Sequence, residues 1–223
     1  MSILLGALIV LWFTFAFINY RHRRRAEFIN SFEFPTSIKK QINSTYPHLN
    51  NEQIELVLDS LKSFFLISYK AKLRPVAMPS QVVDVAWHQF ILFTKNYEGF
   101  CKKGIGRFLH HTPTEAMKSK TTAQEGIKRA WRLACDLESI NPKKPERLPM
   151  LFAIDAKLKI KDGFIYSKNC KNKKSPNYGK HYCASHIGCS SGCSGSSGDS
   201  THNCDSGSSC GSSCGSSCGG GGD

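Results

Sequence analysis

The stretch NNEQIELVLDSLKSFFLIS, residues 50–68, holds the most regular hydrophobic pattern in the chain. Its apolar residues recur at steps of three and four, which is the period of one face of an α-helix. They are Ile54, Val57, Leu58, Leu61, Phe64 and Phe65. Asn50 or Asn51 is placed to cap this helix, since an asparagine side chain accepts a hydrogen bond from the first turn. A helix with so wide an apolar face must pack against others, so the stretch predicts a mainly α-helical domain.

Similar patterns on both sides predict the rest of this domain, which we expect at residues 35–167 with four to five helices. Prolines 75 and 79 make the segment between them a loop, because proline fits neither a helix interior nor a sheet ladder. Gly104 and Gly106 are placed to end a helix. The expected helical segments are 35–46, 50–68, 80–96, 97–103 as an extension or a new helix, and 121–141.

The last part of the domain predicts a small β-structure. Residues 158–166 read LKIKDGFIY, with the dipeptide Asp162-Gly163 between two alternating segments. Asp-Gly between such segments favours the tight turn of a β-hairpin. We therefore expect one β-hairpin at the C-terminal end of the helical domain.

An uncharged apolar segment precedes the domain. Residues 3–18 read ILLGALIVLWFTFAFI, with Thr14 as their one polar side chain. As a helix, residues 2–20 are about 28 Å long, close to the roughly 30 Å of a bilayer core. A cleavable secretory signal has positive charge before its apolar part and small residues after it, and this segment has neither. Residues 1–20 are therefore expected to be a retained transmembrane helix.

Basic residues follow this helix at once. Arg21, Arg23, Arg24 and Arg25 lie within five residues of one another, and no Lys or Arg precedes them. The positive-inside bias then places the domain in the cytoplasm and the N-terminus outside. We expect the arginines to contact the bilayer and its anionic lipid headgroups from a basic juxtamembrane linker, residues 21–34. Nucleic acid is not an expected partner, because no aromatic stacking motif accompanies them.

The last 41 residues differ in composition from the rest. They hold 7 of the 10 cysteines and 11 of the 18 glycines of the 223-residue chain. Such a segment cannot bury enough apolar surface to offset its ordering entropy, so residues 183–223 are predicted to be a disordered tail. A basic linker, residues 168–182, precedes the tail. All 30 basic side chains precede residue 181 and three of the 17 acidic ones follow it, which leaves residues 1–182 at +16.

The densest group of chemically active side chains begins with DVAWH at residues 84–88. Asp84 and His88 are four apart and share one helix face. His88, Cys101 and one of the adjacent His110 and His111 offer donors suited to zinc or iron, with Asp84 holding the other ring nitrogen of His88. The alternative is that His88 is a buried histidine bonded to Asp84 and that Cys101 is a small core residue. Spacing alone leaves both interpretations open.

Several segments around this group resemble a known family. They are MPSQVVDVAWH at 78–88, FTKNY at 93–97, FC at 100–101, GRFLHH at 106–111 and LPMLFAIDAKL at 148–158. Together they resemble the glycine-rich domain-containing protein-like family of bacteria and plants, over roughly residues 50–200, and the tail fits its bacterial members. The shared residues are Asp84, Trp87, His88, Tyr97, Cys101 and Arg107. The resemblance implies no defined activity, and it implies the bacterial inner membrane as the location.

A second group of donors opens the tail. Cys183, His186, Cys189 and Cys193 follow one another at steps of three, three and four, which suits a tetrahedral zinc site. Disulfides are rare in a reducing cytoplasm, so the cysteines there are expected as free thiols or as metal ligands. A plain solvated tail, a redox sensor and a lipidated segment are the alternatives.

Signatures of catalysis are missing from the sequence. It contains no GxxxxGK, no HExxH and no strand-linked GxGxxG motif. Cys101 with His110 as nucleophile and base lacks a third group to orient the base. We therefore expect an interaction or scaffold protein with an unknown protein partner, anchored in the membrane, rather than an enzyme. The alternative is a protein that binds zinc or iron at one of the two donor groups.

Overall fold

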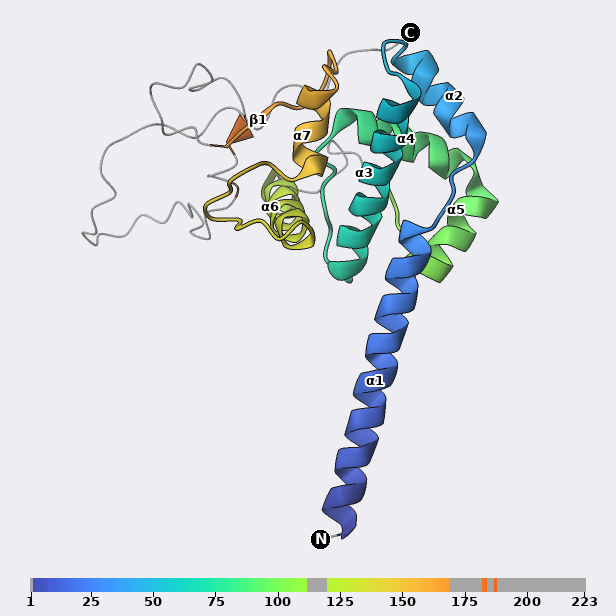
Figure 1. The fold of residues 1–223 in the computed structure, drawn as a ribbon, viewed down its shortest axis with the longest axis vertical. Coiled ribbons are helices and arrows are strands. Elements are labelled where there is room, and N and C mark those ends of the chain that lie inside the picture. Colours follow the sequence, from blue (N-terminus) through green and yellow to red (C-terminus); the bar gives the residue numbers. More distant parts are fainter. Residues whose placement is uncertain (1, 112–119, 169–181, 184–186, 188–223) are drawn as a thin grey trace, which may run out of the picture.

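The computed structural model describes residues 2–111, 120–168, 182–183 and 187, and these residues are mainly helical, as the hydrophobic pattern predicts. A long helix, α1, projects from a body in which the other helices pack around α3 (Figure 1). The helices are α1 Ser2–Asn30, α2 Thr36–Thr45, α3 Asn51–Lys70, α4 Gln81–Leu92, α5 Thr94–Phe100, the π-helix η1 Cys101–Ile105, α6 Lys120–Leu137 and α7 Met150–Lys157. Two short strands, β1 Tyr166–Ser167 and β2 Tyr182–Cys183, pair in parallel.

Helix α3 forms the centre of the body and begins where its sequence predicts. The Asn50 side chain accepts a hydrogen bond from the N–H of Gln53, and the Gln53 side chain accepts one from the N–H of Asn50. This reciprocal cap satisfies two N–H groups that the helix itself leaves free. All of the predicted apolar residues are buried, namely Ile54, Val57, Leu58, Leu61, Phe64 and Phe65.

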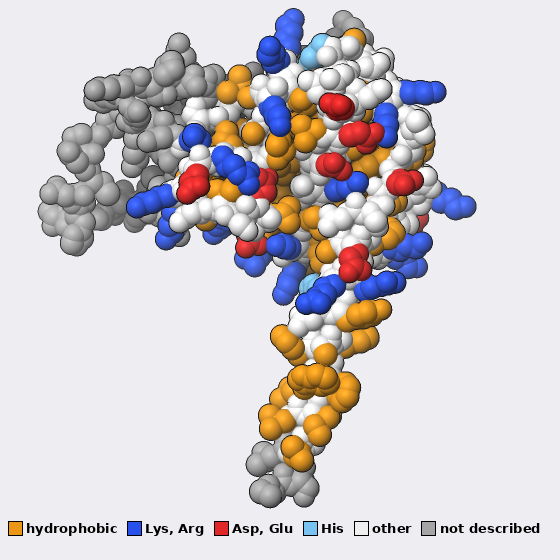
Figure 2. Space-filling model, in the orientation of Figure 1, with side chains coloured by type: hydrophobic (Ala, Val, Ile, Leu, Met, Phe, Trp, Pro, Cys, Tyr) orange, Lys and Arg blue, Asp and Glu red, His pale blue; other side chains and the backbone are white. Residues whose placement is uncertain are grey.

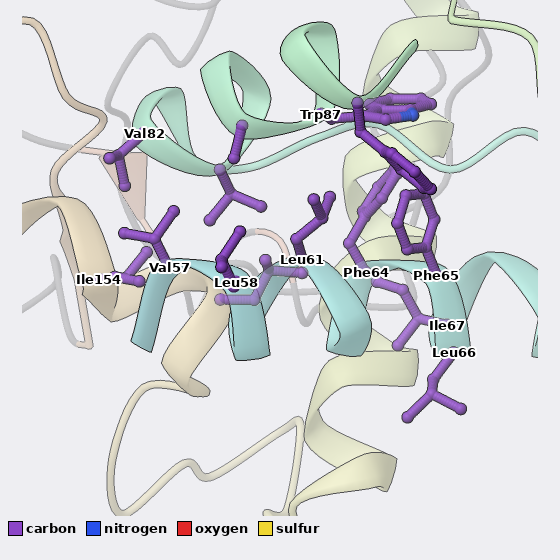
Figure 3. Packing of buried hydrophobic residues seen from close by; sticks show 14 of the residues in the cluster. Val57, Leu58, Leu61, Phe64, Phe65, Leu66, Ile67, Val82, Trp87 and Ile154 are labelled. Atoms are coloured by element: carbon purple, nitrogen blue, oxygen red, sulfur yellow. The ribbon is translucent and has the colours of Figure 1, made fainter. Parts of the chain in front are cut away.

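Helix α4 lies across the apolar face of α3. Ser80 caps it by accepting a hydrogen bond from the N–H of Val83, as expected. Figure 3 shows Trp87 of α4 packed against Phe64 and Phe65 of α3, and the centroid of its ring lies 4.9 Å from that of Phe64 and 6.2 Å from that of Phe65. Because this face of α4 is buried, its other face, which carries Asp84 and His88, is turned toward solvent.

A tight π-turn follows α4 and α5. We expected the glycines to end a helix here, and Gly106 does so at φ 85°, a conformation that favours glycine. Its N–H donates to the carbonyl of Cys101 at 2.7 Å. A Cβ atom on Gly104 would lie 2.9 Å from the Ile29 side chain, so η1 packs closely on the end of α1. The described part of the domain has more helices than expected, because residues 150–157 form one and the segment 97–103, expected as an extension or a new helix, is divided between α5 and η1.

The predicted β-hairpin is wrong. Asp162 and Gly163 do form a turn, in which the Gly163 N–H donates to the Ile160 carbonyl, but the segments 158–161 and 164–166 do not pair as strands. The physical reason lies in the apolar run before the turn. Residues 150–157 form the helix α7, whose buried side chains pack against α3 and α4, and the chain then folds back onto that helix. Tyr166 instead pairs in parallel with Tyr182.

Hydrogen bonds to the Asp155 side chain of α7 hold the chain in this folded-back position. This side chain is 2% exposed and its two carboxylate oxygens accept four hydrogen bonds. The donors are Ser80 Oγ at 2.7 Å, the N–H of Gln81 at 2.7 Å, the N–H of Val82 at 3.3 Å and the N–H of Phe164 at 2.8 Å. One buried carboxylate thus joins α7, the N-terminus of α4 and the turn after Asp162. The N-terminus of a helix favours such a negative charge.

Helix α1 continues beyond the point where we expected a linker. Residues 21–34 were predicted as a basic juxtamembrane linker, but α1 runs on to Asn30 without a break. The reason is that its last turns belong to the core, since Ile29 is buried and Ala26 and Phe28 pack against the same cluster. The first part of α1 makes no such contacts, and the helix is apolar enough to span a membrane.

Candidate metal centre

Three ligand-type side chains meet on the solvent-facing side of α4. Asp84 and His88 stand one turn apart on the helix, and His111 reaches them from the segment that follows η1. His111 Nε2 lies 3.0 Å from Asp84 Oδ1, and His88 Nε2 lies 3.4 Å from His111 Nδ1. One potential ligand atom from each residue falls within 4.8 Å of the others. These three residues form what we call the histidine centre.

A chain of hydrogen bonds sets the position of His111. The Trp87 ring N–H donates to the Tyr97 hydroxyl at 3.1 Å, and that hydroxyl donates to the Leu109 carbonyl at 2.5 Å. The Trp87 ring also contacts the His111 ring, with centroids 4.5 Å apart. Burial raises the pKa of the Tyr97 hydroxyl well above its usual range, so it stays protonated and able to donate. Trp87 and Tyr97, two of the residues shared with the resembled family, therefore fix the segment that carries His111.

The structure assembles only part of the predicted ligand set. His88 and His111 meet, whereas Cys101 and His110 lie outside the histidine centre. Cys101 is 1% exposed, and burial raises the pKa of its thiol, although the Leu109 backbone and the Tyr97 hydroxyl partly oppose this. Its environment is that of a core residue, and a buried protonated thiol is neither a metal ligand nor a nucleophile. His110 is exposed and packs against Phe108 instead.

Arg107 has a local structural contact. Its guanidinium group donates to the Lys72 carbonyl, at the start of the loop after α3. Lys72 has a φ of 57°, which is a left-handed conformation that leaves its carbonyl without a helical partner. Arg107 therefore joins the end of η1 to the end of α3, and it takes no part in the histidine centre.

A family model described as UCP032817-like matches residues 24–187, which is most of the chain. The chain belongs to the UCP032817-like family. The match contains the whole histidine centre and the last turns of α1, and it begins after the end of the apolar segment, residues 3–18. No curated protein and no solved structure matches the chain. The family description names no activity, and the resemblance to glycine-rich domain-containing proteins stays a prediction.

The second predicted metal site lies at the edge of this UCP032817-like match. The backbone of Cys183 belongs to β2, and its pairing with Ser167 places it beside the end of β1. His186, Cys189 and Cys193 lie outside the described residues, as does the rest of the predicted disordered tail apart from Cys183 and Ile187. The possibility of zinc binding there is therefore still a prediction from spacing.

Proposed function

We propose that this protein binds a metal ion, and that His88 and His111 are the ligands of a zinc ion. The observation that supports this most directly is the 3.4 Å separation between His88 Nε2 and His111 Nδ1. Two nitrogens bound at about 2.0–2.1 Å to one tetrahedral zinc ion are about 3.3–3.4 Å apart. The nitrogens therefore already have the spacing that the ion requires. Iron(II) accepts the same donors and is the alternative metal.

The position of the Asp84 carboxylate also supports the proposal, because it lies beside one nitrogen of each histidine ring. Its Oδ1 atom lies 3.0 Å from His111 Nε2, and its Oδ2 atom lies 3.7 Å from His88 Nδ1. These are the nitrogens that face away from the gap between the rings. At hydrogen-bond distance from His111, the carboxylate keeps a hydrogen on the outer nitrogen of that ring and leaves the lone pair of its inner nitrogen free for a metal. The sequence predicted this role toward His88, and the shorter distance favours it for His111.

A purely structural role for His88 fits the geometry less well. A histidine retained for packing is buried and hydrogen-bonded, whereas the His88 side chain is 49% exposed. Its ring lies within hydrogen-bond reach of His111 at 3.4 Å, but its distance of 3.7 Å to Asp84 is too long for the hydrogen bond that a structural role beside Asp84 requires. Two histidine ligands leave two tetrahedral positions on the ion, which water or a group from another molecule fills.

We expect His111→Ala to lower zinc affinity by at least about 100-fold, because one of two protein ligands is lost. Asp84→Asn should lower it by about 10- to 100-fold while a bound metal is retained. The measurement is titration of the chelator-stripped full chain in detergent with Zn²⁺ by calorimetry. Titration with Co²⁺ adds the visible bands of a tetrahedral site.

His110→Ala is the matched control, since this neighbour of His111 is exposed and lies outside the histidine centre. It should bind zinc as the unaltered chain does. A double substitution of Cys183 and His186 to alanine separates the tail from the body. Metal uptake that persists in His111→Ala and disappears in the tail variant would refute the histidine centre as the binding site. No uptake in any form would leave the interaction or scaffold function as the proposal.

We further propose that α1 spans a membrane and that the body lies in the cytoplasm. The support is the length and composition of α1 and the position of Arg21, Arg23, Arg24 and Arg25 after its apolar part. Alkaline phosphatase is active only outside the cytoplasm, so we expect a fusion to the C-terminus of the full chain to be inactive. A fluorescent protein fused at the same place should fluoresce. An active phosphatase fusion would reverse the proposed orientation.

A further inference from the structure

A hollow lies where α1 meets the end of α3. It has a volume of about 290 Å³ and is lined by Ile18, Arg21, His22, Arg25 and Tyr69. Figure 2 shows basic side chains at this junction, between the bare apolar part of α1 and the body. Two guanidinium groups, an imidazole and a phenol thus surround one small space, with an apolar residue at its outer edge. We call this space the junction hollow.

We propose that the junction hollow binds the phosphate of an anionic phospholipid headgroup. This rests on the proposed membrane span of α1. Arg21 and Arg25 follow Ile18, the last residue of the apolar run, by three and seven positions, which is about 4.5 and 10.5 Å along a helix. The polar layer on each side of a bilayer core is about 5–7 Å thick. The backbone of Arg21 therefore stands within this layer, and that of Arg25 stands a few ångströms outside it, a distance that a long arginine side chain spans.

The hollow is a formed site rather than a loose basic segment. The Tyr69 hydroxyl lies 2.6 Å from His22 Nδ1, and the Arg25 guanidinium lies over the Tyr69 ring at 5.8 Å from its centroid. A Cβ atom on Gly106 would lie 1.8 Å from an Arg25 terminal nitrogen, so the absence of a side chain there makes room for this arginine. The half-buried Arg25 side chain thus lies between the Tyr69 ring of α3 and Gly106, which follows η1.

The positive charges of Arg21 and Arg25 are available to bind an anion. No Asp or Glu among the described residues forms an ion pair with Arg21 or Arg25. Arg guanidinium groups bind phosphate oxygens through paired hydrogen bonds, which gives them a geometric fit that a single ammonium lacks. Arg23 and Arg24 are equally charged but do not line the hollow. The two pairs therefore differ in position and not in charge.

A second hollow extends the same surface on the other side of Tyr69. It is lined by Lys72, Leu73, Ile105, Gly106 and Arg107 in addition to Tyr69, and it is also about 290 Å³. The Leu73 side chain is 85% exposed, and Lys72 and Arg74 flank it in the sequence. Basic side chains beside an apolar one are the combination that interfacial segments present to a lipid surface. The end of the body nearest α1 therefore has the chemistry of a surface that rests on the leaflet.

The test compares an anionic lipid with a zwitterionic one that has the same acyl chains. The full chain is stripped of lipid in detergent and mixed with equal amounts of phosphatidylglycerol and phosphatidylcholine of the same acyl chains. Native mass spectrometry then counts the lipids that stay bound. We expect a preference for phosphatidylglycerol that Arg21→Gln reduces by about fivefold and that Arg23→Gln leaves unchanged. Tyr69→Phe keeps the ring and removes the hydroxyl, and it should also weaken the preference.

The controls separate this proposal from the one on which it rests. Arg21 is exposed, so its substitution leaves the fold intact, which the helical circular dichroism signal checks. An equal reduction by Arg21→Gln and Arg23→Gln would show a general attraction to charge and overturn the specific site. No preference in the unaltered chain would overturn it as well. Failure of the membrane span would appear separately, as release of the full chain from vesicles by alkaline carbonate.

Discussion

Asp155→Ala is expected to lower the free energy of unfolding by about 3–5 kcal/mol. The substitution leaves the Ser80 hydroxyl and the N–H groups of Gln81, Val82 and Phe164 without their acceptor. Buried donors without partners are costly, and the loss is a large part of the roughly 5–15 kcal/mol that stabilises a typical domain. Urea unfolding of the full chain in detergent, followed by circular dichroism, measures it.

Asp162→Asn serves as the control for this substitution, because Asp162 is exposed and close to Asp155 in sequence. Its loss of stability should stay below about 1 kcal/mol, as for most surface substitutions. Asp155→Asn preserves the size of the side chain but presents N–H groups to some of the same donors. We expect it to be destabilising as well. A cost below about 1 kcal/mol for Asp155→Ala would contradict the structural role of this carboxylate.

A loss of stability at alkaline pH is the second large effect that we expect. Burial raises the pKa of the Cys135 thiol from 9.0 to about 12, and it also raises the pKa values of Cys101, Tyr46 and Tyr97. The native state therefore holds protons that the unfolded chain has already released. For Cys135 the contribution is complete below pH 9 and is lost as the pH rises toward 12. Each unit by which the pKa of a group in the native state exceeds its pKa in the unfolded chain corresponds to about 1.4 kcal/mol of the free energy of unfolding.

The free energy of unfolding should accordingly be steady near neutral pH and fall steeply above about pH 9. Cys135→Ala removes one titrating group, so its curve should fall less steeply than that of the unaltered chain. The slope is a better readout than the absolute stability, because the smaller side chain lowers stability at every pH through lost packing. Identical slopes for the two proteins would show that Cys135 is not protonated more tightly in the native state.

The helices could be predicted where the hydrophobic period is long and the caps are clear. Helix α3 has six apolar positions in register and an asparagine cap, and it forms as expected. Residues 150–157 have too short an apolar run to distinguish a strand from a helix. Their environment decides, because α3 and α4 bury the run and Asp155 binds the turn that follows. The Asp162-Gly163 pair favours a hairpin through local geometry alone. The hydrogen bond from the Phe164 N–H to Asp155 holds the chain against α7 instead.

The histidine centre could be predicted in part. The step of four between Asp84 and His88 places both on one helix face, and this follows from helix geometry alone. Whether His110 or His111 joins them depends on the register of the segment after η1. The bond from the Tyr97 hydroxyl to the Leu109 carbonyl sets that register, and nothing in the local sequence reveals it. Cys101 was predicted as a ligand because its sulfur is a good donor to zinc or iron. It lies on the buried side of the π-helix η1, away from the two histidines.

Asp155 had a signal that the sequence analysis did not use. It is the one charged residue between Met150 and Ala156, in a run whose other members are apolar. A single carboxylate in such a run is expensive to bury unless several donors surround it. The sequence therefore predicts that hydrogen-bond donors surround Asp155, and the N-terminus of another helix supplies such N–H groups.

The unbroken course of α1 from its apolar end to Ile29 has a mechanical consequence. The apolar part of α1 and the part packed into the core belong to one continuous helix. The body is therefore expected to tilt and rotate together with the membrane segment. A thinner bilayer forces a long apolar helix to lean further. The same lean would carry the two histidines along an arc and change their height above the lipid surface.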